Sequence, residues 1–454
     1  MNYPFWDVPF IGSGWVIGSI AIFHVMISHF AVGGGLYLAL AERRARQIGS
    51  DAWLSILEKH SKFFLILTGV FGAASGAAIW FAIGLANPEG TSTLIHNFVF
   101  GWAIEWIFFL LELSAAAVYY YTWHRIPAKT HLALGWFYAV VSFLTLFIIN
   151  GILTFMLTPS AAWLSAAGTG QETFYFFQAF FNPTFWPSLG LRLVICASLA
   201  GIYALITCGR LTPKENPAKA EMVQWSARWL VPSFILMPIL FAWYLAMVPE
   251  VQRAFLSIGI SSAAPGIFTQ VTRSAILTTV SSATIVVAVY LFVWKKPEDF
   301  TLGAGLAILF LALIATGSTE HGREMLRKPF VIGQHMFSNG VRKSDVATFN
   351  QKGYLTASPW MKGIKIPSKE AGLIMFRGQC KSCHTDDGYR PMKKFMAGRD
   401  LPAIKNVLGV LHDYKEDSPY RRYMPPLVGK PSEIESLAIY LDSMVNGSAA
   451  DAKK

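Results

Sequence analysis

Long apolar stretches separated by short polar loops fill the first two thirds of the chain. Most of them reach the roughly 20 residues that an α-helix needs to cross a bilayer. They lie at 13–41, 62–86, 98–122, 132–158, 187–208, 227–248, 273–294 and 300–317. The pattern predicts an all-α, polytopic transmembrane helical bundle of eight spans within residues 1–325.

Composition supports a membrane protein and argues against a nucleic-acid partner. Of 454 residues, 54% are hydrophobic and 14% are charged, whereas soluble domains carry about 25% charged residues. A net charge of +11 would fit a nucleic-acid-binding protein. However, the basic residues lie in short loops and in the C-terminal tail rather than on one soluble face. We therefore expect contact with a lipid membrane and not with nucleic acid.

The loops alternate in basic charge, and this predicts the orientation of the spans. Every second loop, beginning with the loop after the first span, carries Lys and Arg, whereas residues 87–97 carry none. Cytoplasmic loops are enriched in these residues, so the N-terminus is expected outside, and an even number of spans returns the chain there. We expect a multi-pass protein of the cell inner membrane with its N-terminus and C-terminal domain on the periplasmic side. The basic loop residues are Arg43, Arg44, Arg46, Arg125, Lys129, Arg210, Lys214, Lys219, Lys295 and Lys296.

From Glu320 the apolar runs end and charged residues become common. Residues 326–366, which contain several prolines, are expected to form a membrane-surface connector. Residues 367–450 are expected to form a small all-α domain. Its first helix is predicted over 368–379 and its last over 431–444, with Ser432 as the N-terminal cap.

Cys380, Cys383 and His384 form a Cys-x-x-Cys-His motif, the attachment signature of a c-type haem. The two thiols bind the haem covalently, and His384 then ligates the iron from one side. The alternatives are a redox dithiol or half of a zinc site, but zinc would need a second Cys/His pair and no cysteine follows Cys383. Haem c is attached on the periplasmic side of energy-transducing membranes, which agrees with the predicted topology.

The C-terminal domain resembles class I cytochrome c over about 80 residues. The resemblance rests on the haem motif after an N-terminal helix, on Met424 followed by two prolines, and on a closing helix with Leu437 and Tyr440. It implies that Met424 is the second axial ligand of haem c, because His/Met ligation is common in such proteins. Met392 and Met396 are rival ligands, and a plain surface-loop methionine is the alternative interpretation of Met424.

Ionisable residues inside the predicted spans are functional candidates. His24 and His29 lie in the first span, five residues apart, and therefore face different directions. Each is either a haem ligand, which we favour for His24, or a buried histidine bonded to a helix carbonyl, which we favour for His29. Glu105 and Glu112 lie seven residues apart on one face of the third span and are the candidate catalytic residues. For Glu105 we favour a proton path or an iron ligand over structural packing.

Three further features could serve a haem. Arg192 and Arg273, within or at the end of spans, could neutralise haem propionates or extend toward the membrane surface. A polar cluster follows the eighth span, at 319–324 and 327–335. It is expected at the outer surface, where it could line a haem edge or form an ordinary interfacial segment.

The membrane part resembles subunit I of cytochrome bd-type oxidases over most of residues 10–340. The resemblance is carried by short segments: Phe23-His24 with Gly33, Ala103-Ile104-Glu105, Asn150-Gly151, Asn182-Pro183, Gly322-Arg323 and Lys328-Pro329-Phe330-Val331-Ile332-Gly333. It implies a haem-bearing helical bundle with an oxygen-reducing centre near the outer side, non-covalent haems of b and/or d type, and His24 as a haem ligand.

The chain departs from that family's pattern at its electron entry. Leu191 and Arg192 stand where the family has a histidine ligand of a low-spin haem, and Ala275 stands near the position of its methionine partner. The connection 248–272 is too short for the family's large quinol-binding loop. A high-spin haem ligand, glutamate in the family, is replaced by Gln334, and His335 beside it could substitute.

These departures lead to one expected function and one alternative. The first is the haem-bearing subunit of a bd-like terminal oxidase that reduces O2 with electrons taken through its own haem c from a c-type cytochrome or another periplasmic donor, and not from quinol. A second membrane subunit is expected. The alternative is a non-enzymatic, membrane-anchored electron-transfer subunit of a larger respiratory complex.

Overall fold

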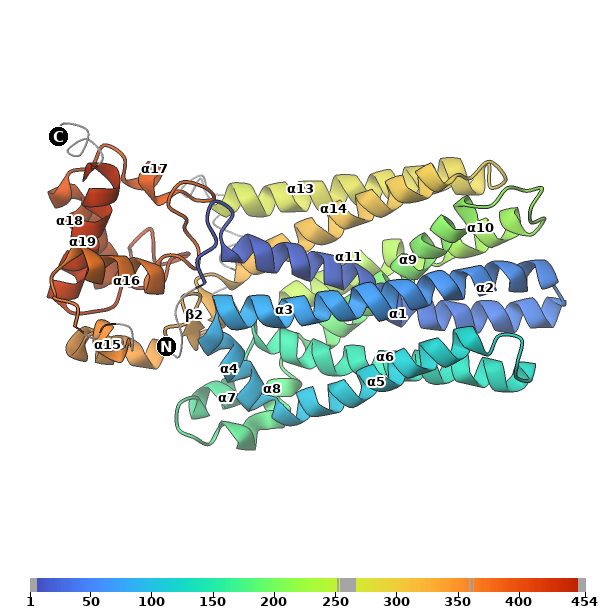
Figure 1. Ribbon diagram of the computed structural model, residues 1–454, viewed down its shortest axis with the longest axis horizontal. Helices are drawn as coiled ribbons and strands as arrows, with labels where there is room; N and C mark the ends of the chain where they lie inside the picture. The colour runs from blue at the N-terminus through green and yellow to red at the C-terminus, as the bar shows by residue number, and fades with distance from the viewer. Residues whose placement is uncertain (1–5, 251–252, 254–266, 359–360, 362, 448–454) are drawn as a thin grey trace.

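The computed structural model describes residues 6–250, 253, 267–358, 361 and 363–447. Eight helical segments of this part of the chain are long and apolar enough to cross a membrane, which confirms the predicted bundle. They run side by side, and the C-terminal domain lies at one end of them (Figure 1). The segments are α1 (Ser13–Ile48), α2 to α3 (Asp51–Ile66, then the π-helical η1, Leu67–Gly72, then Ala73–Ala86), α5 (Val99–Tyr121), α6 (Ala128–Phe155), α9 (Phe185–Gly209), α10 with α11 (Lys219–Arg228 and Val231–Met247), α13 with η3 (Ile267–Ala288 and Val289–Trp294) and α14 (Leu302–Arg327).

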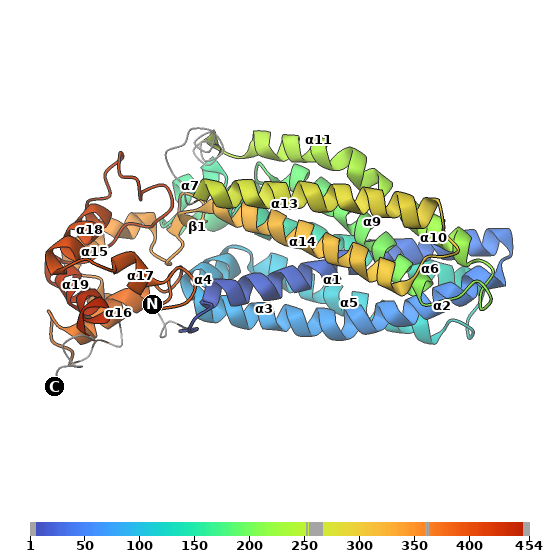
Figure 2. The ribbon, with the colours of Figure 1, turned by 90° about the horizontal axis from the view of Figure 1, so that it is seen from above.

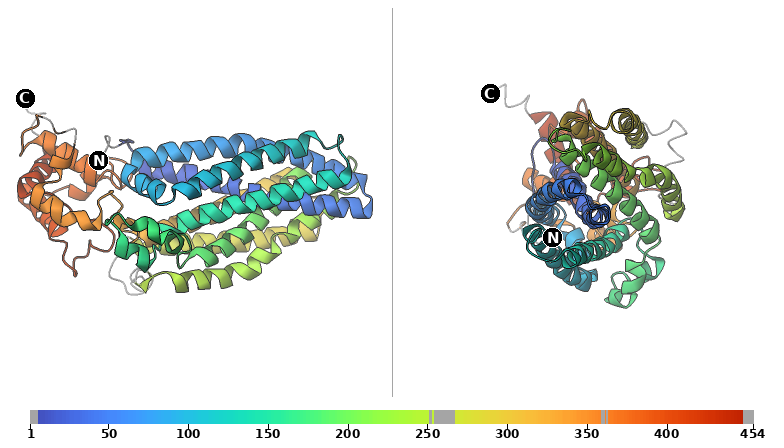
Figure 3. Two further views of the ribbon diagram at one scale, coloured as in Figure 1. Left: turned by 90° about the horizontal axis from the view of Figure 1, so that it is seen from below. Right: turned by 90° about the vertical axis from the view of Figure 1, so that its right-hand side faces the viewer.

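Helix α1 is the centre of the bundle and packs against α9, α6, α3, α2 and α14 (Figure 3). Small residues allow this close packing, as is usual between membrane helices. A Cβ atom on Gly33 would lie 2.0 Å from the carbonyl oxygen of Cys196 on α9, and one on Gly35 would lie 2.1 Å from the ring of Tyr138 on α6. Glycine at these two positions therefore sets how closely α9 and α6 approach α1.

Several helices extend beyond the predicted apolar runs. The first span continues to Ile48, beyond the predicted end at 41, and the eighth continues to Arg327, beyond 317. Charged side chains pair within these helices: Arg46 with Glu42, and Arg323 with Glu320 at 2.7 Å. Such pairs stabilise a helix at its polar end. The predicted polar cluster therefore begins inside α14 rather than after it.

Short helices and a hairpin cover the end of the bundle that faces the C-terminal domain. The hairpin consists of the antiparallel strands β1 and β2, and Gly333 N in its turn donates to Met156 O at 2.9 Å, at the end of α6. The elements are α4 (Pro88–Asn97), α7 (Ala161–Ala166), η2 (Glu172–Tyr175), α8 (Phe176–Phe180), β1 (Phe330–Ile332) and β2 (Met336–Phe337).

The C-terminal domain is a small helical unit with its own core. Its central contact is the crossing of α16 and α19, where a Cβ atom on Gly372 would lie 2.0 Å from Ser436 O. Phe337, Tyr354 and Leu355 of the predicted connector belong to the same core. The elements are η4 (Lys343–Asp345), α15 (Val346–Lys352), η5 (Leu355–Ala357), α16 (Lys369–Gln379), α17 (Met392–Met396), α18 (Leu401–Asp413) and α19 (Pro431–Val445).

The predicted cap of the last helix is wrong. Lys430 is the N-cap residue and Pro431 occupies the first helical turn, so Ser432 lies inside α19. Proline is favoured there because the first helical N–H groups have no helical partner. The carboxylate of Glu433 accepts from the backbone N–H of Lys430, Tyr354 and Leu355 at 2.7–2.9 Å. Glu433 thereby ties residues 354–355 to the start of α19.

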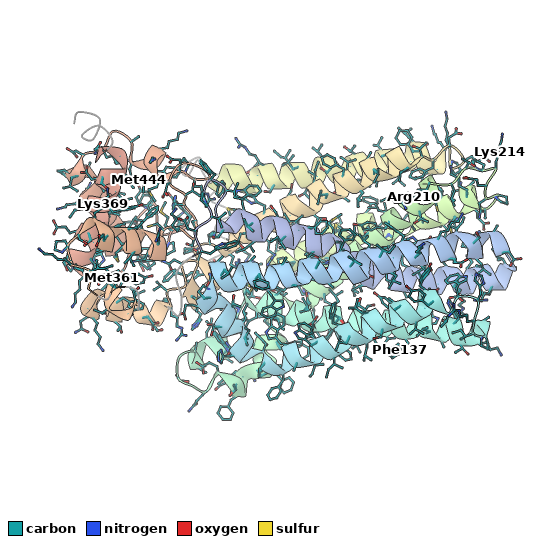
Figure 4. All side chains as sticks on the ribbon, viewed as in Figure 1. Phe137, Arg210, Lys214, Met361, Lys369 and Met444 are labelled. Atoms are coloured by element: carbon teal, nitrogen blue, oxygen red, sulfur yellow. The ribbon has the colours of Figure 1, made fainter. Side chains whose placement is uncertain are left out.

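The basic loops lie at the end of the bundle opposite the C-terminal domain, as Arg210 and Lys214 show in Figure 4. The α1–α2 and α5–α6 turns lie at that same end (Figure 1). We call this the inner end, and the end that faces the C-terminal domain the outer end.

Candidate functional site: two haem-binding positions

The Cys-x-x-Cys-His segment continues directly from α16. Backbone N–H groups of Cys383 and His384 donate to the carbonyl oxygen of Cys380 at 3.1 and 2.9 Å. This tight turn carries both thiols and the imidazole on one short loop. Both cysteines are free thiols, so they are available for thioether bonds.

The imidazole of His384 is oriented for ligation by its second nitrogen. Its Nδ1 lies 3.1 Å from the carbonyl oxygen of Arg390. A carbonyl oxygen only accepts, so Nδ1 carries the proton and Nε2 keeps a lone pair. Burial lowers the pKa of His384 and so favours the neutral ring that a metal ligand requires. The residue fits an axial haem ligand.

The two thiols lie in different electrostatic surroundings. Burial would raise the pKa of the Cys383 thiol, but the Lys328 ammonium, 4.0 Å from its sulfur, brings the pKa below the usual value. Burial raises the pKa of the Cys380 thiol to about 12. Lys328 follows α14 directly, so the motif touches the membrane bundle through this contact.

Three methionines compete for the second axial position. Met424 lies in a half-buried loop whose backbone is fixed by Tyr414: the Tyr414 hydroxyl donates to Met424 O at 3.1 Å, and Arg421 donates to Tyr414 O at 2.7 Å. Met392 and Met396 are buried in the domain core on α17. A well-held loop suits a weak thioether ligand, so Met424 stays the predicted ligand.

The haem motif rests on the outer end of α1. Lys381 Nζ lies 2.8 Å from a carboxylate oxygen of Asp7, and Tyr389 N donates to Phe10 O at 2.5 Å. A Cβ atom on Gly14, in the first turn of α1, would lie 3.9 Å from Ser382 O inside the motif. Figure 2 shows the domain at the end where α1 begins and α14 ends. The segment that carries the Cys-x-x-Cys-His motif is therefore in contact with the start of α1 and the residues just before it.

His24 lies about 15 Å further along α1 than Gly14, at 1.5 Å per residue. Its Nδ1 lies 3.0 Å from the Ser75 hydroxyl of α3. That hydroxyl donates its own proton to Phe71 O at 2.6 Å, so its oxygen accepts from Nδ1. Nε2 of His24 is left with a lone pair. His24 therefore fits a neutral haem ligand, held in place by Ser75.

His29 has both nitrogens engaged. Nδ1 lies 3.0 Å from Val25 O, one turn back on α1, and Nε2 lies 3.5 Å from an amino group of Arg192 on α9. This is the buried arrangement that the sequence favoured for His29. Arg192 points into the bundle at this contact rather than toward the membrane surface.

The two acidic residues of α5 differ in their surroundings. Glu112 is 8% exposed, and Tyr138 OH donates to its Oε1 at 2.7 Å. Glu105 is half-buried and lies about 10 Å closer to the outer end. Glu112 is thus hydrogen-bonded inside the bundle, whereas Glu105 is nearer the level of His24.

Two further predicted residues lie at the outer end. The ring of His335, in the β1–β2 turn, packs edge-on against Trp163 at 5.0 Å, and burial lowers the pKa of His335. Arg273 is exposed on α13. In the part of the chain that the structure describes, no group of three or more His, Cys, Asp or Glu converges as at a multi-ligand metal centre. A haem needs only one or two protein ligands, and the Nε2 lone pairs of His24 and His384 have the chemistry for that role.

Comparison with known proteins gives a family match that covers the first five spans. Residues 13–210 match the family model of cytochrome bd terminal oxidase subunit I. The match includes His24, Glu105, Glu112 and Arg192. Comparison with curated proteins finds no match.

A solved structure shares the fold. The bd oxidase from Geobacillus thermodenitrificans superimposes with a TM-score of 0.60 at 16% sequence identity, over 70% of this chain and 87% of the matched chain. At this identity the likeness establishes the fold of the bundle. The family match ends at residue 210, before the haem motif begins.

The sequence did not reveal the partners that orient the two histidines. Ser75 is one small polar residue in an apolar run, and Arg390 acts through its backbone carbonyl. Only a serine at the level of His24 on a neighbouring span could have been suspected, because hydroxyl groups inside membrane helices need a partner.

Proposed function

We propose that this protein is the haem-bearing subunit of a bd-like terminal oxidase that takes electrons from a c-type cytochrome or another periplasmic donor and reduces O2. The family match over residues 13–210 and the shared fold support the oxidase part. The Cys380–His384 motif supports the c-type entry. A second membrane subunit is proposed from the same family likeness.

The observation that carries the proposal is the seating of the haem motif on α1. Ser382 lies beside Gly14, and the same helix holds His24, whose Nδ1 faces the Ser75 hydroxyl. When bound, a haem c at Cys380 and Cys383 would exchange single electrons, and a membrane haem at His24 would bind and reduce O2. The chain would thus hold both centres against one rigid element. His384 and Met424 would hold the haem c iron.

The structure also supports replacement of a quinol entry. Arg192 stands where the family has a haem-ligating histidine, and it contacts His29. The expected short connection at 248–272 lies largely outside the described residues, between the end of α11 at Met247 and the start of α13 at Ile267. We propose that Arg273 and His335 serve the outer haem edge.

The proposed orientation of the protein in the membrane rests on what lies at each end of the bundle. The basic loops lie at the inner end and the C-terminal domain at the outer end (Figure 4), and by the positive-inside rule we propose that the domain lies in the periplasm. A reporter that is active only in the cytoplasm, fused after Lys454, should be silent. Activity of that reporter would reverse the proposed orientation.

The purified complex tests the function directly. It should oxidise reduced cytochrome c, or an artificial one-electron donor, with matching oxygen uptake, and a quinol analogue should be a poor substrate. Rapid, inhibitor-sensitive quinol oxidation would contradict the c-type entry. Donor oxidation without oxygen uptake would instead favour a non-enzymatic electron-transfer subunit.

A further inference from the structure

The segment just before α1 lies against the loop that carries the Cys-x-x-Cys-His motif. We call residues 6–12 the N-terminal arm and residues 380–390 the motif loop. The arm lies between the bundle and the C-terminal domain (Figures 1 and 2). The carbonyl oxygen of Phe10 in the arm accepts a hydrogen bond from the backbone N–H of Tyr389 at 2.5 Å. Directly after the arm, the ring of Trp15 meets the Tyr389 ring edge-on at 5.7 Å.

The close approach of the arm requires glycine at position 388 of the motif loop. A Cβ atom on Gly388 would lie 1.8 Å from the carbonyl oxygen of Phe10 and 2.2 Å from its Cα atom. The φ angle of Gly388 lies outside the left-handed region in which glycine is favoured. The backbone conformation of the motif loop therefore does not require glycine here, whereas the contact with the arm does.

The arm adopts a conformation that its own sequence does not favour. Phe10 has a φ angle of 62°, which is uncommon for a bulky residue. Its side chain is 71% exposed, so packing of the ring does not hold it in place. Such a conformation persists only where the surroundings fix it. The hydrogen bond from Tyr389 and the ion pair described next are contacts that fix the arm from outside.

A buried ion pair joins the arm to the motif itself. Lys381, which stands between the two cysteines, is 8% exposed. Its Nζ lies 2.8 Å from a carboxylate oxygen of Asp7 in the arm and 3.1 Å from one of Asp386 in the motif loop. A buried ammonium group is costly unless it is paired. Asp7 is therefore the acid that the arm contributes to a charge inside the motif.

We infer that the N-terminal arm is a clamp that fixes the motif loop against α1 for electron transfer to the membrane haem, with Asp7 and Gly388 as positioning residues. The arm takes no part in the chemistry: one electron leaves haem c as the membrane haem gains it, and no bond in the arm changes. Transfer between two haems slows steeply as they move apart, so the arm would control its rate. The inference rests on the proposed function, because it presupposes electron passage from haem c to a haem at His24.

The variant Gly388→Ala tests the clamp in the purified complex without removing a charge. An artificial donor should reduce haem c at the wild-type rate, whereas transfer from haem c to the membrane haem should slow about tenfold or more, because displacement of reacting groups by about 1 Å is costly in rate. Stopped-flow spectra at the bands of the two haems measure both steps. The matched control is Gly409→Ala on α18, where a Cβ atom meets nothing within 4 Å, and it should change neither. Wild-type transfer between the haems in Gly388→Ala would overturn the inference.

The variant Asp7→Asn tests the clamp from the arm, and it decides the question if Gly388→Ala fails to assemble. The same step should slow by a smaller factor, because Asp386 still pairs with Lys381. Asp387→Asn is the control: it breaks the exposed pair of Asp387 with Lys393 at 2.7 Å in and beside the motif loop and should leave the rate unchanged. Wild-type transfer between the haems in Asp7→Asn would overturn the clamp.

Hydrogen–deuterium exchange separates this inference from the oxidase proposal. In Gly388→Ala the backbone N–H of Tyr389 loses its acceptor, so peptides that cover the arm and the motif loop should exchange faster than in the wild type, while the crossing of α16 and α19 keeps its protection. The haem c potential should not change. This readout needs no turnover. Absence of oxygen uptake in the wild type would defeat the proposed function alone, whereas unchanged exchange in Gly388→Ala would defeat the clamp alone.

Discussion

The outer and inner ends of the bundle use histidine in opposite ways. At the outer end, His384 and His24 each bond Nδ1 to a fixed acceptor, Arg390 O or the Ser75 hydroxyl, and leave Nε2 with a lone pair. At the inner end, His131 has both nitrogens engaged. A metal ligand must offer a lone pair. His384 and His24 meet this condition, whereas His131, like His29 on α1, has both nitrogens engaged.

A free nitrogen alone does not make a haem site. His60 also bonds Nδ1, to the Thr207 hydroxyl at 2.8 Å, and its Nε2 has no partner in the described part of the chain. However, His60 is 1% exposed, and the rings of Phe30 and Tyr37 pack against it at 5.9 and 5.5 Å. No macrocycle fits there without moving these rings. His24 differs because it is half-buried and lies beside Gly76.

The largest effect is expected from substitution of His24. His24→Ala removes the proposed ligand on α1, so the complex should lose non-covalent haem while haem c stays bound. Extraction with acidified acetone, followed by spectroscopy of the extract and of the precipitated protein, measures the non-covalent haem and the haem c separately. The exposed outer-end histidine His96 gives the control: His96→Ala should keep both. Full retention of extractable haem in His24→Ala would return His24 to a buried structural histidine.

Met424→Ala tests the second ligand in the C-terminal domain. Loss of the thioether should lower the haem c potential, because His/Met ligation raises it, and should remove the sulfur-to-iron charge-transfer band. A redox titration with visible spectra measures both. Met444→Ala, in the closing helix α19, should change neither. If Met424→Ala leaves the band in place, Met392 or Met396 becomes the ligand.

A smaller effect is expected from the residue that orients His24. Ser75→Ala removes the acceptor of Nδ1 and frees the ring to rotate, and such partners typically contribute about 10- to 100-fold in metal affinity. Titration of haem release from the purified complex should show weaker binding with the ligand still present. Ser92→Ala is the matched control, because the Ser92 hydroxyl faces Nδ1 of exposed His96 at 3.3 Å. Equal haem affinity in Ser75→Ala and wild type would remove Ser75 from the site.

The sequence predicted the bundle well because eight apolar runs of bilayer length leave little choice of fold. It missed the helix ends because charged side chains there pair inside the helix: Arg46 with Glu42 in α1, and Arg323 with Glu320 in α14. Placing the end of the first span at 41 left Glu42 outside it, although the structure buries this residue completely.

The sequence predicted which residues belong to the candidate site, but not the hydrogen bonds that orient their side chains. The haem motif and the histidine of the first span stand out because their chemistry is rare in apolar sequence. The acceptors that set their tautomers come from elements distant in the chain, α3 for His24, or from a backbone carbonyl for His384. Only the packing of helices and the path of a loop determine these partners, and neither leaves a local pattern.

The haem content of the purified complex tests the central claim most directly. Pyridine haemochrome spectra before and after acid–acetone extraction should show one haem c per chain that resists extraction, together with at least one extractable haem. A complex without covalently bound haem would contradict the role of Cys380, Cys383 and His384. A complex without extractable haem would contradict the membrane site at His24.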